Sequence, residues 1–188
     1  MSDPQEDTVR LLSDPTTFGA GMDPVECVET HVSKVFIGPD RVFKLKRAVV
    51  FPYLDFSTPE KRREACEAEI RINKRTAPTI YQGVVAITRQ DDGTLALGGE
   101  GETVDWVVDM RRFDQDTLFD RMARAGTLTR AMVEDLADRI ADFHGKAEVN
   151  MEAGGSAGIG MIIKNNDKCF GKLDRQETRR LTRLSLDA

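Results

Sequence analysis

The sequence predicts an α+β fold, because short strand patterns fill residues 25–113 and one strong helix pattern interrupts them. Compact turn sequences separate the strand patterns, and Gly38-Pro39-Asp40 is the clearest of these turns. The expected strands lie at 25–30, 34–37, 41–47, 83–89, 94–97 and 103–110. Because strands joined by such short turns pair antiparallel, we expect an antiparallel sheet with one helix.

Three regions follow one another along the chain. Residues 1–24 are expected to be a polar lead-in with one short helix near Thr8–Leu12, closed by the chain-breaking residues Gly19-Ala20-Gly21 and Asp23-Pro24. Residues 25–113 form the sheet lobe. Residues 114–188 are expected to be helical.

The helix expected at 58–75 has a clear start. Ser57 and Glu60 have the spacing of a capping box, and Pro59 fits the first turn because its missing N–H would have no helical partner there. Farther along, Glu69 falls on the apolar side of the helix. That side is formed by Ala65, Cys66, Ala68 and Ile72. A buried, unpaired carboxylate is costly, so Glu69 needs a cation or access to solvent.

The strand at 41–47 supplies two cations. Alternate side chains share a face, so Lys44 and Lys46 point to one side of the strand with Val42. Phe43 and Leu45 point to the other side, which alone resembles core. Lys44 or Lys46 is therefore the natural partner of Glu69. The plainer alternative is an exposed strand with alternating lysines and a solvated helix glutamate.

After residue 113 the pattern becomes helical. Asp114 and Asp116 can cap a helix that ends at Gly126, and Thr129 can cap the next one. Gly145 suits the position just past the end of this second helix. Its apolar residues recur at helical spacing and are Val133, Leu136, Ile140 and Phe143.

Composition limits the function classes. The chain has 188 residues, enough for one domain or slightly more, and 40% hydrophobic residues, enough for a core. With 32 acidic and 27 basic residues and no free basic block, nucleic acid is not the expected partner. The acidic first ten residues exclude a secretory signal, and no run of 18 apolar residues occurs. We therefore expect a soluble, cytoplasmic protein without a membrane partner.

Metal and disulfide chemistry find little support in the sequence. Cys27, Cys66 and Cys169 are far apart and odd in number, which favours reduced, structural cysteines. His31 and His144 are the only histidines, so a His-rich metal site is excluded.

Five segments in order resemble the amino-terminal part of aminoglycoside-phosphotransferase-like kinases, in the bacterial branch often joined to a P-loop ATPase domain. The segments are Glu29–Ser33, Val42–Lys46, Leu54–Thr58, Cys66–Asn73 and Met110–Phe113. The resemblance runs from about Val9 to the last residue. It implies a kinase-like amino-terminal lobe, made of an antiparallel sheet plus one helix. An incomplete helical carboxy-terminal lobe follows, and its first long helix is the one after Thr129.

The resemblance also implies that the lobe binds ATP. On this match Lys44 is the phosphate-binding lysine and Glu69 is its helix partner, with Lys46 as the alternative lysine. On the same match, residues 103–113 would be the last strand and the hinge that meets adenine.

Two further groups of candidate contacts follow from the same match. Arg111, Arg112 and Phe113 are the candidates at the hinge. In place of a glycine-rich loop the chain has Thr30-His31-Val32-Ser33, so Thr30 and Ser33 are candidates to bind phosphate. The alternative interpretation of these four residues is a simple turn.

The catalytic residues of that family are absent from the sequence. The family's His-Gly-Asp-x-x-x-x-Asn motif, which orients the acceptor hydroxyl and binds Mg²⁺, does not occur, nor does the following metal-binding Asp. His144-Gly145-Lys146 only begins like it, and a helix end explains it better. Gly154–Gly160 lacks the Lys-Ser or Lys-Thr of a P-loop and is expected to be a flexible connection before a helix.

We therefore expect a fragment of an ATP-dependent small-molecule phosphotransferase, truncated before its catalytic loop and inactive as given. The alternative is a non-catalytic kinase-like interaction module. Apolar side chains in the incomplete helical lobe predict self-association, or docking to a missing carboxy-terminal segment or an ATPase domain. Residues from about 150 to 188 are expected to pack poorly.

Overall fold

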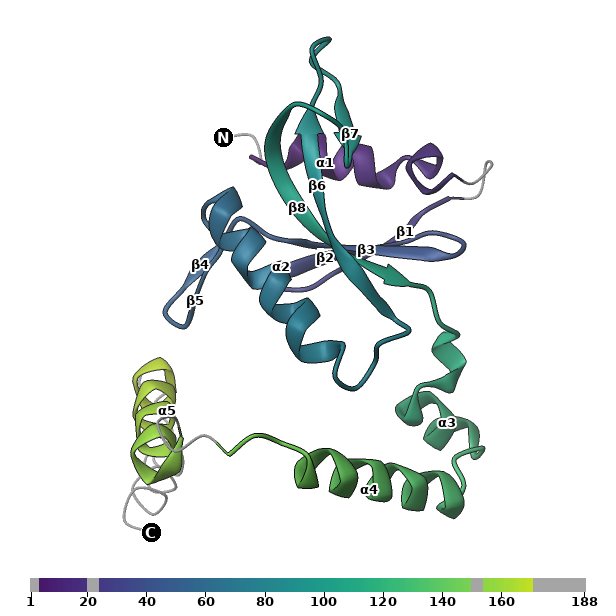
Figure 1. Ribbon diagram of the computed structural model, residues 1–188, viewed down its shortest axis with the longest axis vertical. Coiled ribbons are helices and arrows are strands. Elements are labelled where there is room, and N and C mark those ends of the chain that lie inside the picture. The colour runs from purple at the N-terminus through teal and green to yellow at the C-terminus, as the bar shows by residue number, and fades with distance from the viewer. Residues whose placement is uncertain (1–3, 20–23, 150–153, 171–188) are drawn as a thin grey trace. The chain divides into compact units, whose positions relative to one another are not determined.

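The computed structural model describes residues 4–19, 24–149 and 154–170. The chain divides into two compact units, one ending at Thr129 and one beginning at Arg130. The sequence placed this boundary at residue 113. The first unit therefore contains the whole sheet together with the first helix after it (Figure 1).

The first unit contains eight strands and three α-helices among its described residues. The strands are β1 (Glu26–Glu29), β2 (Ser33–Ile37), β3 (Arg41–Lys46), β4 (Val50–Phe51), β5 (Leu54–Asp55), β6 (Tyr81–Arg89), β7 (Leu95–Leu97) and β8 (Glu102–Arg111). The helices are α1 (Glu6–Ser13), α2 (Pro59–Asn73) and α3 (Phe119–Ala125), with 3-10 turns η1 (Pro15–Phe18) and η2 (Gln115–Thr117).

Six of these strands form one antiparallel sheet in the order β1-β2-β3-β8-β6-β7. The predicted α+β class and the antiparallel sheet are confirmed. The chain passes from β3 to α2 before it returns to the sheet. As a result β8, the last strand in sequence, pairs between β3 and β6 at the centre of the sheet.

One face of the sheet carries the apolar core. Its fully buried residues are Leu12, Phe36, Phe43, Leu45, Ile87 and Val107. Leu12 comes from α1, and Phe18 of η1 packs against the same cluster. The segment expected to be a polar lead-in therefore contributes to the core, because α1 buries an apolar side on the sheet.

The other face of the sheet is covered by α2, which packs against β8 and β6 (Figure 1). The helix starts one residue later than the capping-box spacing predicted. Thr58 is the N-cap and accepts from the backbone N–H of Lys61, whereas Ser57 donates to Asp55. Ile72, expected in the apolar side, is 56% exposed. The buried side of α2 instead contains Arg62 and Cys66.

A small hairpin of β4 and β5 lies between β3 and α2, and the sequence patterns did not predict it. Each strand has only two residues, too few for an alternating pattern, and Pro52 in the loop reads as a breaker. The rings of Phe51 and Tyr53 stack with centroids 5.7 Å apart, and His31 meets Phe51 edge-on.

The first helix after the sheet ends where the sequence predicted. Gly126 adopts the left-handed conformation just past α3, with φ of 70°. Asp114 caps η2 by accepting from the backbone N–H of Asp116, so the segment starts with a 3-10 turn before α3.

The second unit contains α4 (Arg130–Gly145) and α5 (Gly155–Phe170) among its described residues. Gly145 is the last helical residue of α4 and does not lie past its end. Gly154–Gly160 was expected to be a flexible connection before a helix, but from Gly155 onward the segment already belongs to α5, whose early turns also contain Ala157 and Ile159. The exposed apolar side chains expected here are present and include Val133, Leu136, Ile140, Ile159 and Ile162.

Predictions for residues 171–188 concern a part of the chain that the structure does not describe. No helix in the described ranges is long and apolar enough to cross a membrane.

Candidate functional site

Glu69 of α2 binds both lysines of β3. Lys44 Nζ donates to Glu69 Oε1 at 2.8 Å, and Lys46 Nζ donates to Glu69 Oε2. The predicted ion pair between the helix carboxylate and the strand lysines is therefore confirmed, with both candidates engaged at once. We call Lys44, Lys46 and Glu69 the Glu69 cluster.

Strand alternation and helix spacing bring these three residues together. Lys44 lies opposite Val108 in the sheet register, so its side chain leaves the sheet on the α2 side. Glu69 follows Arg62 by seven residues, two helical turns along the buried side of α2. The sequence had assigned core only to the opposite face of β3. That assignment is wrong, because Val42 and Lys46 on this face are also buried.

The Glu69 cluster carries more positive than negative charge. Burial opposes ionisation of Glu69, but hydrogen bonds from Lys44 and Lys46 outweigh it and lower the pKa of Glu69 below its ordinary value. One carboxylate thus faces two ammonium groups. The side chain of Lys44 is 29% exposed, whereas those of Lys46 and Glu69 are 10% exposed. Lys44 is therefore the cation that can also reach a bound anion.

Tyr81, the first residue of β6, lies close enough to Glu69 for an electrostatic interaction with its carboxylate. Burial raises the pKa of Tyr81, and the negative charge of Glu69 raises it further. Lys46 is held by a second neighbour, because its Nζ lies 5.7 Å from the centre of the Phe56 ring. The cluster therefore sits between α2, β3 and the start of β6.

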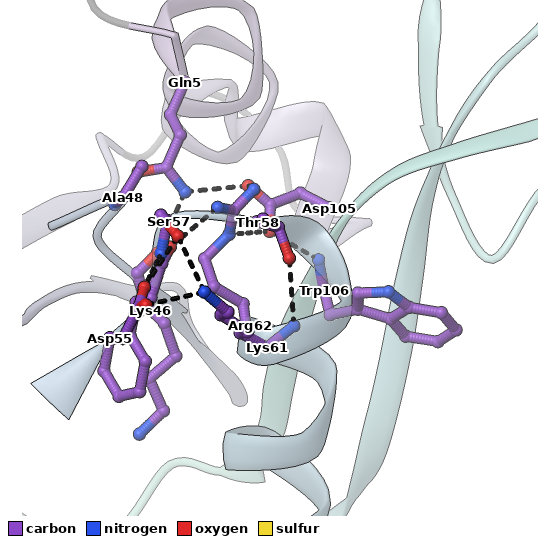
Figure 2. Close-up of polar contacts among 11 residues, drawn as sticks. Gln5, Lys46, Ala48, Asp55, Ser57, Thr58, Lys61, Arg62, Asp105 and Trp106 are labelled. Atoms are coloured by element: carbon purple, nitrogen blue, oxygen red, sulfur yellow. Dashed lines mark hydrogen bonds and ion pairs between the residues drawn. The ribbon is translucent and has the colours of Figure 1, made fainter. Parts of the chain in front are cut away.

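A second polar cluster lies two helical turns away and was not predicted. Arg62 Nε donates to Asp105 Oδ1 at 2.7 Å and its Nη2 donates to Asp105 Oδ2 at 3.0 Å (Figure 2). Gln5 Nε2 donates to Asp105 Oδ2 at 2.7 Å and to the Lys46 carbonyl at 2.9 Å. The backbone N–H of Ala48 donates to Gln5 Oε1 at 2.8 Å. We call Gln5, Arg62 and Asp105 the Asp105 cluster.

The Asp105 cluster joins the two faces of the sheet. Asp105 alternates with Val107 on the core face, yet its carboxylate binds Arg62 from the opposite face. The last pair between β3 and β8 is Leu45 with Val107. Asp105 therefore lies beyond the hydrogen-bonded part of the two strands, where groups from both faces can reach it.

Two sequence signals point to this cluster in retrospect. Arg62, Cys66 and Glu69 have the spacing of one helix side, and Asp105 interrupts an apolar strand of Val104 and Trp106–Val108. Cys66 lies between the two clusters, and burial raises the pKa of its thiol to about 12.

Thr30 and Ser33, the candidate phosphate contacts, close the turn between β1 and β2. The Thr30 hydroxyl accepts from the Ser33 N–H at 3.0 Å and donates to the Ser33 carbonyl at 3.1 Å. The Ser33 hydroxyl is buried and has no hydrogen-bond partner among the described residues. Thr30 and Ser33 are therefore turn residues in this structure, as the alternative interpretation of the sequence expected.

The candidate adenine contacts lie at the end of β8: Arg111 is its last residue, and Arg112 and Phe113 follow it. The Arg111 N–H donates to the Ile80 carbonyl at 2.8 Å, and the Arg112 N–H donates to the Asp40 carbonyl at 2.9 Å. These two N–H groups are therefore already used within the protein. All three residues are exposed, and Phe113 is an aromatic side chain that is 36% exposed.

The remaining motifs do not join the clusters. His144 and Gly145 end helix α4, in agreement with the helix-end interpretation. Within the described ranges no three His, Cys, Asp or Glu side chains gather as a metal site. Cys27 and Cys66 are free cysteines.

Comparison with known proteins finds uncharacterized relatives. The chain is 32% identical over 126 residues to the uncharacterized proteins Mb2027c of Mycobacterium bovis and Rv2004c of Mycobacterium tuberculosis. The match covers 67% of this chain and 24% of each relative, so the chain spans about a quarter of the length of the relatives it matches. No family model and no solved structure matches the chain significantly.

Proposed function

We propose that the chain contains the nucleotide-binding lobe of an ATP-dependent phosphotransferase, and that the Glu69 cluster binds the phosphates of ATP. One observation carries the proposal: Lys44 is oriented by Glu69 at 2.8 Å while its side chain stays 29% exposed. A lysine that is held by a helix carboxylate, and still has donors to spare, is what kinases use to orient nucleotide phosphates.

Charge and fold support the same function. With two lysines and one ionised glutamate, the Glu69 cluster has a net charge of +1, so it attracts an anion. An antiparallel sheet with α2 packed on it is the arrangement expected of a kinase amino-terminal lobe, as the resemblance of the sequence implied. Phe113, two residues past the end of β8, is the proposed contact with the base.

Phosphate transfer requires residues that this sequence lacks. The Asp that orients an acceptor hydroxyl and the residues that bind Mg²⁺ have no counterpart in it. We therefore propose that the chain binds ATP without transferring its phosphate. The helical part after Thr129 would contact a further segment or domain that supplies the chemistry.

Calorimetric titration with ATP tests the proposal. The chain is expected to bind ATP, and Lys44→Met is expected to weaken binding at least about tenfold, the effect of losing a charged hydrogen bond of about 1.4 kcal/mol or more. Lys34→Met is a matched control, since Lys34 is also a strand lysine paired with a glutamate, Glu29, at 3.4 Å. Absence of ATP binding, or equal losses in the two variants, would overturn the proposal and favour a non-catalytic interaction module.

A further inference from the structure

The backbone of Lys46 is held by a residue from the other end of the lobe. The Lys46 carbonyl accepts from Gln5 Nε2 at 2.9 Å, and the Ala48 N–H donates to Gln5 Oε1. Gln5 immediately precedes α1 and is buried. Both the carbonyl and the amide of this one side chain therefore fix the chain just after β3, where Lys46 joins the Glu69 cluster.

Gln5 also reaches the helix that carries Glu69, through Asp105. The Asp105 carboxylate accepts from Gln5 on one face of the sheet and from Arg62 of α2 on the other. Arg62 Nη1 donates in addition to the Phe56 carbonyl at 3.0 Å, which fixes the chain just before α2. Figure 2 shows the contacts of Gln5 and Arg62 with the Asp105 carboxylate.

The geometry of α2 transmits this constraint to Glu69. Arg62 and Glu69 lie on the same side of the helix and are seven residues apart, about 10.5 Å along its axis. A rigid helix whose first turns are fixed by a bidentate ion pair cannot rotate without moving Glu69 away from Lys44. Gln5 is thus connected to two members of the Glu69 cluster: it binds the Lys46 carbonyl directly, and it is linked to Glu69 through Asp105 and Arg62.

We propose that Gln5 is a positioning residue for the Glu69 cluster, so that docking of α1 on the core face is coupled to phosphate binding on the opposite face. This inference rests on the proposed function. The coupling is reciprocal, because a ligand that needs Lys44, Lys46 and Glu69 in place must also stabilise the docked state of α1. The amino-terminal segment then belongs to the nucleotide site without touching the nucleotide.

The variant Gln5→Met tests this coupling, because it keeps the length of the side chain and removes its hydrogen bonds. We expect it to raise the dissociation constant for ATP at least about fivefold, the lower range of coupling between sites. The dissociation constant for adenosine, which has no phosphate, should change less than about twofold. Arg10→Met is the matched control on the exposed side of α1, where Arg10 pairs with Glu6 and Asp7, and it should change neither dissociation constant.

A second measurement reports the position of α2 without any nucleotide. The buried Cys66 thiol lies on α2 between Arg62 and Glu69, so its labelling by a maleimide requires α2 to move. Mass spectrometry of the labelled peptides should show faster labelling of Cys66 in Gln5→Met and unchanged labelling of the exposed Cys27. This result would support the coupling even if the wild-type chain failed to bind ATP, and that failure would count against the proposed function alone.

Hydrogen exchange of the wild-type chain covers the case in which Gln5→Met does not fold. The Ala48 amide is protected by the Gln5 side chain, so its exchange reports docking of Gln5. Saturating ATP should slow exchange of this amide. Equal Cys66 labelling and equal ATP affinity in Gln5→Met, or an Ala48 amide indifferent to bound ATP, would overturn the inference.

Discussion

The two polar clusters under α2 contain similar groups and differ in how completely they are enclosed. In the Asp105 cluster the side chains of Arg62 and Asp105 are 5% and 2% exposed, and one guanidinium meets one carboxylate. In the Glu69 cluster one carboxylate meets two ammonium groups, and Lys44 reaches the surface. A buried ion pair whose charges cancel has neither net charge nor exposed donors with which to bind a ligand. The excess charge and exposure of the second cluster are what a binding site needs.

The largest effect is expected from breaking the sealed cluster. Arg62→Met leaves the Asp105 carboxylate buried without its cation, which should cost about 3 to 5 kcal/mol of unfolding free energy. Urea denaturation measures this loss. The neighbouring variant Arg63→Met is the control, since Arg63 is exposed, pairs with Glu67 at the surface and lies over the Trp106 ring, two contacts worth about 1 kcal/mol each at most. Equal losses in the two variants would remove the structural role assigned to the Asp105 cluster.

A smaller loss is expected at the centre of the open cluster. Glu69→Gln keeps the shape of the side chain but leaves Lys44 and Lys46 side by side without their shared carboxylate. The expected loss is about 1 to 3 kcal/mol, because Lys44 can turn toward water. The same denaturation experiment measures it. A loss as large as that of Arg62→Met would mean that the Glu69 cluster is itself a sealed structural pair.

Substitution of Lys46 should mainly affect the stability of the fold, and substitution of Lys44 should mainly affect ATP binding. Lys46 is nearly buried and contacts the Phe56 ring, so Lys46→Met is expected to change the unfolding free energy more than Lys44→Met does. Lys44→Met should stay within about 1 kcal/mol of the wild type and weaken ATP binding more. Denaturation and ATP titration of both variants show which substitution has the larger effect on stability and which on ATP affinity. A reversed order would assign the phosphate contact to Lys46, the alternative lysine of the sequence analysis.

The smallest effect is expected from pH. The pKa of Glu69 is lower in the folded chain than its ordinary value, so its ion pairs stabilise the fold above about pH 4.3 and the contribution is lost as pH falls below it. The stability difference between wild type and Glu69→Gln should therefore shrink between about pH 6 and about pH 3. Denaturation curves across this range check the trend. A constant difference would show that Glu69 does not stabilise the fold as a carboxylate.

The open cluster could be predicted from the sequence and the sealed one could not. Strand alternation places Lys44 and Lys46 on one face of their strand, and the helix period places Glu69 among apolar side chains, so these local periods determine which face each residue takes. Arg62 and Asp105 are 43 residues apart, and their contact depends on where β3 stops pairing with β8. No local sequence pattern encodes the residue at which this strand pairing ends.

The same limit explains the amino-terminal segment and the hairpin. The short helix predicted near Thr8–Leu12 is confirmed as α1, but its part in the core depends on Leu12 meeting Phe43 and Ile87 from distant strands, which a local reading of residues 1–24 cannot show. The β4–β5 hairpin has two residues in each strand and offers no period to detect. The α+β class followed from the strand and helix periods alone, which is why it was predicted correctly.

The most direct test of the central claim is the affinity of adenosine, AMP, ADP and ATP for the wild-type chain and for Lys44→Met, measured by calorimetry in the absence of divalent cations. If the Glu69 cluster binds phosphates, affinity should rise along this series in the wild type. Lys44→Met should flatten the rise while leaving adenosine binding unchanged. Equal affinity along the series, or a rise that survives Lys44→Met, would contradict a phosphate site at Lys44.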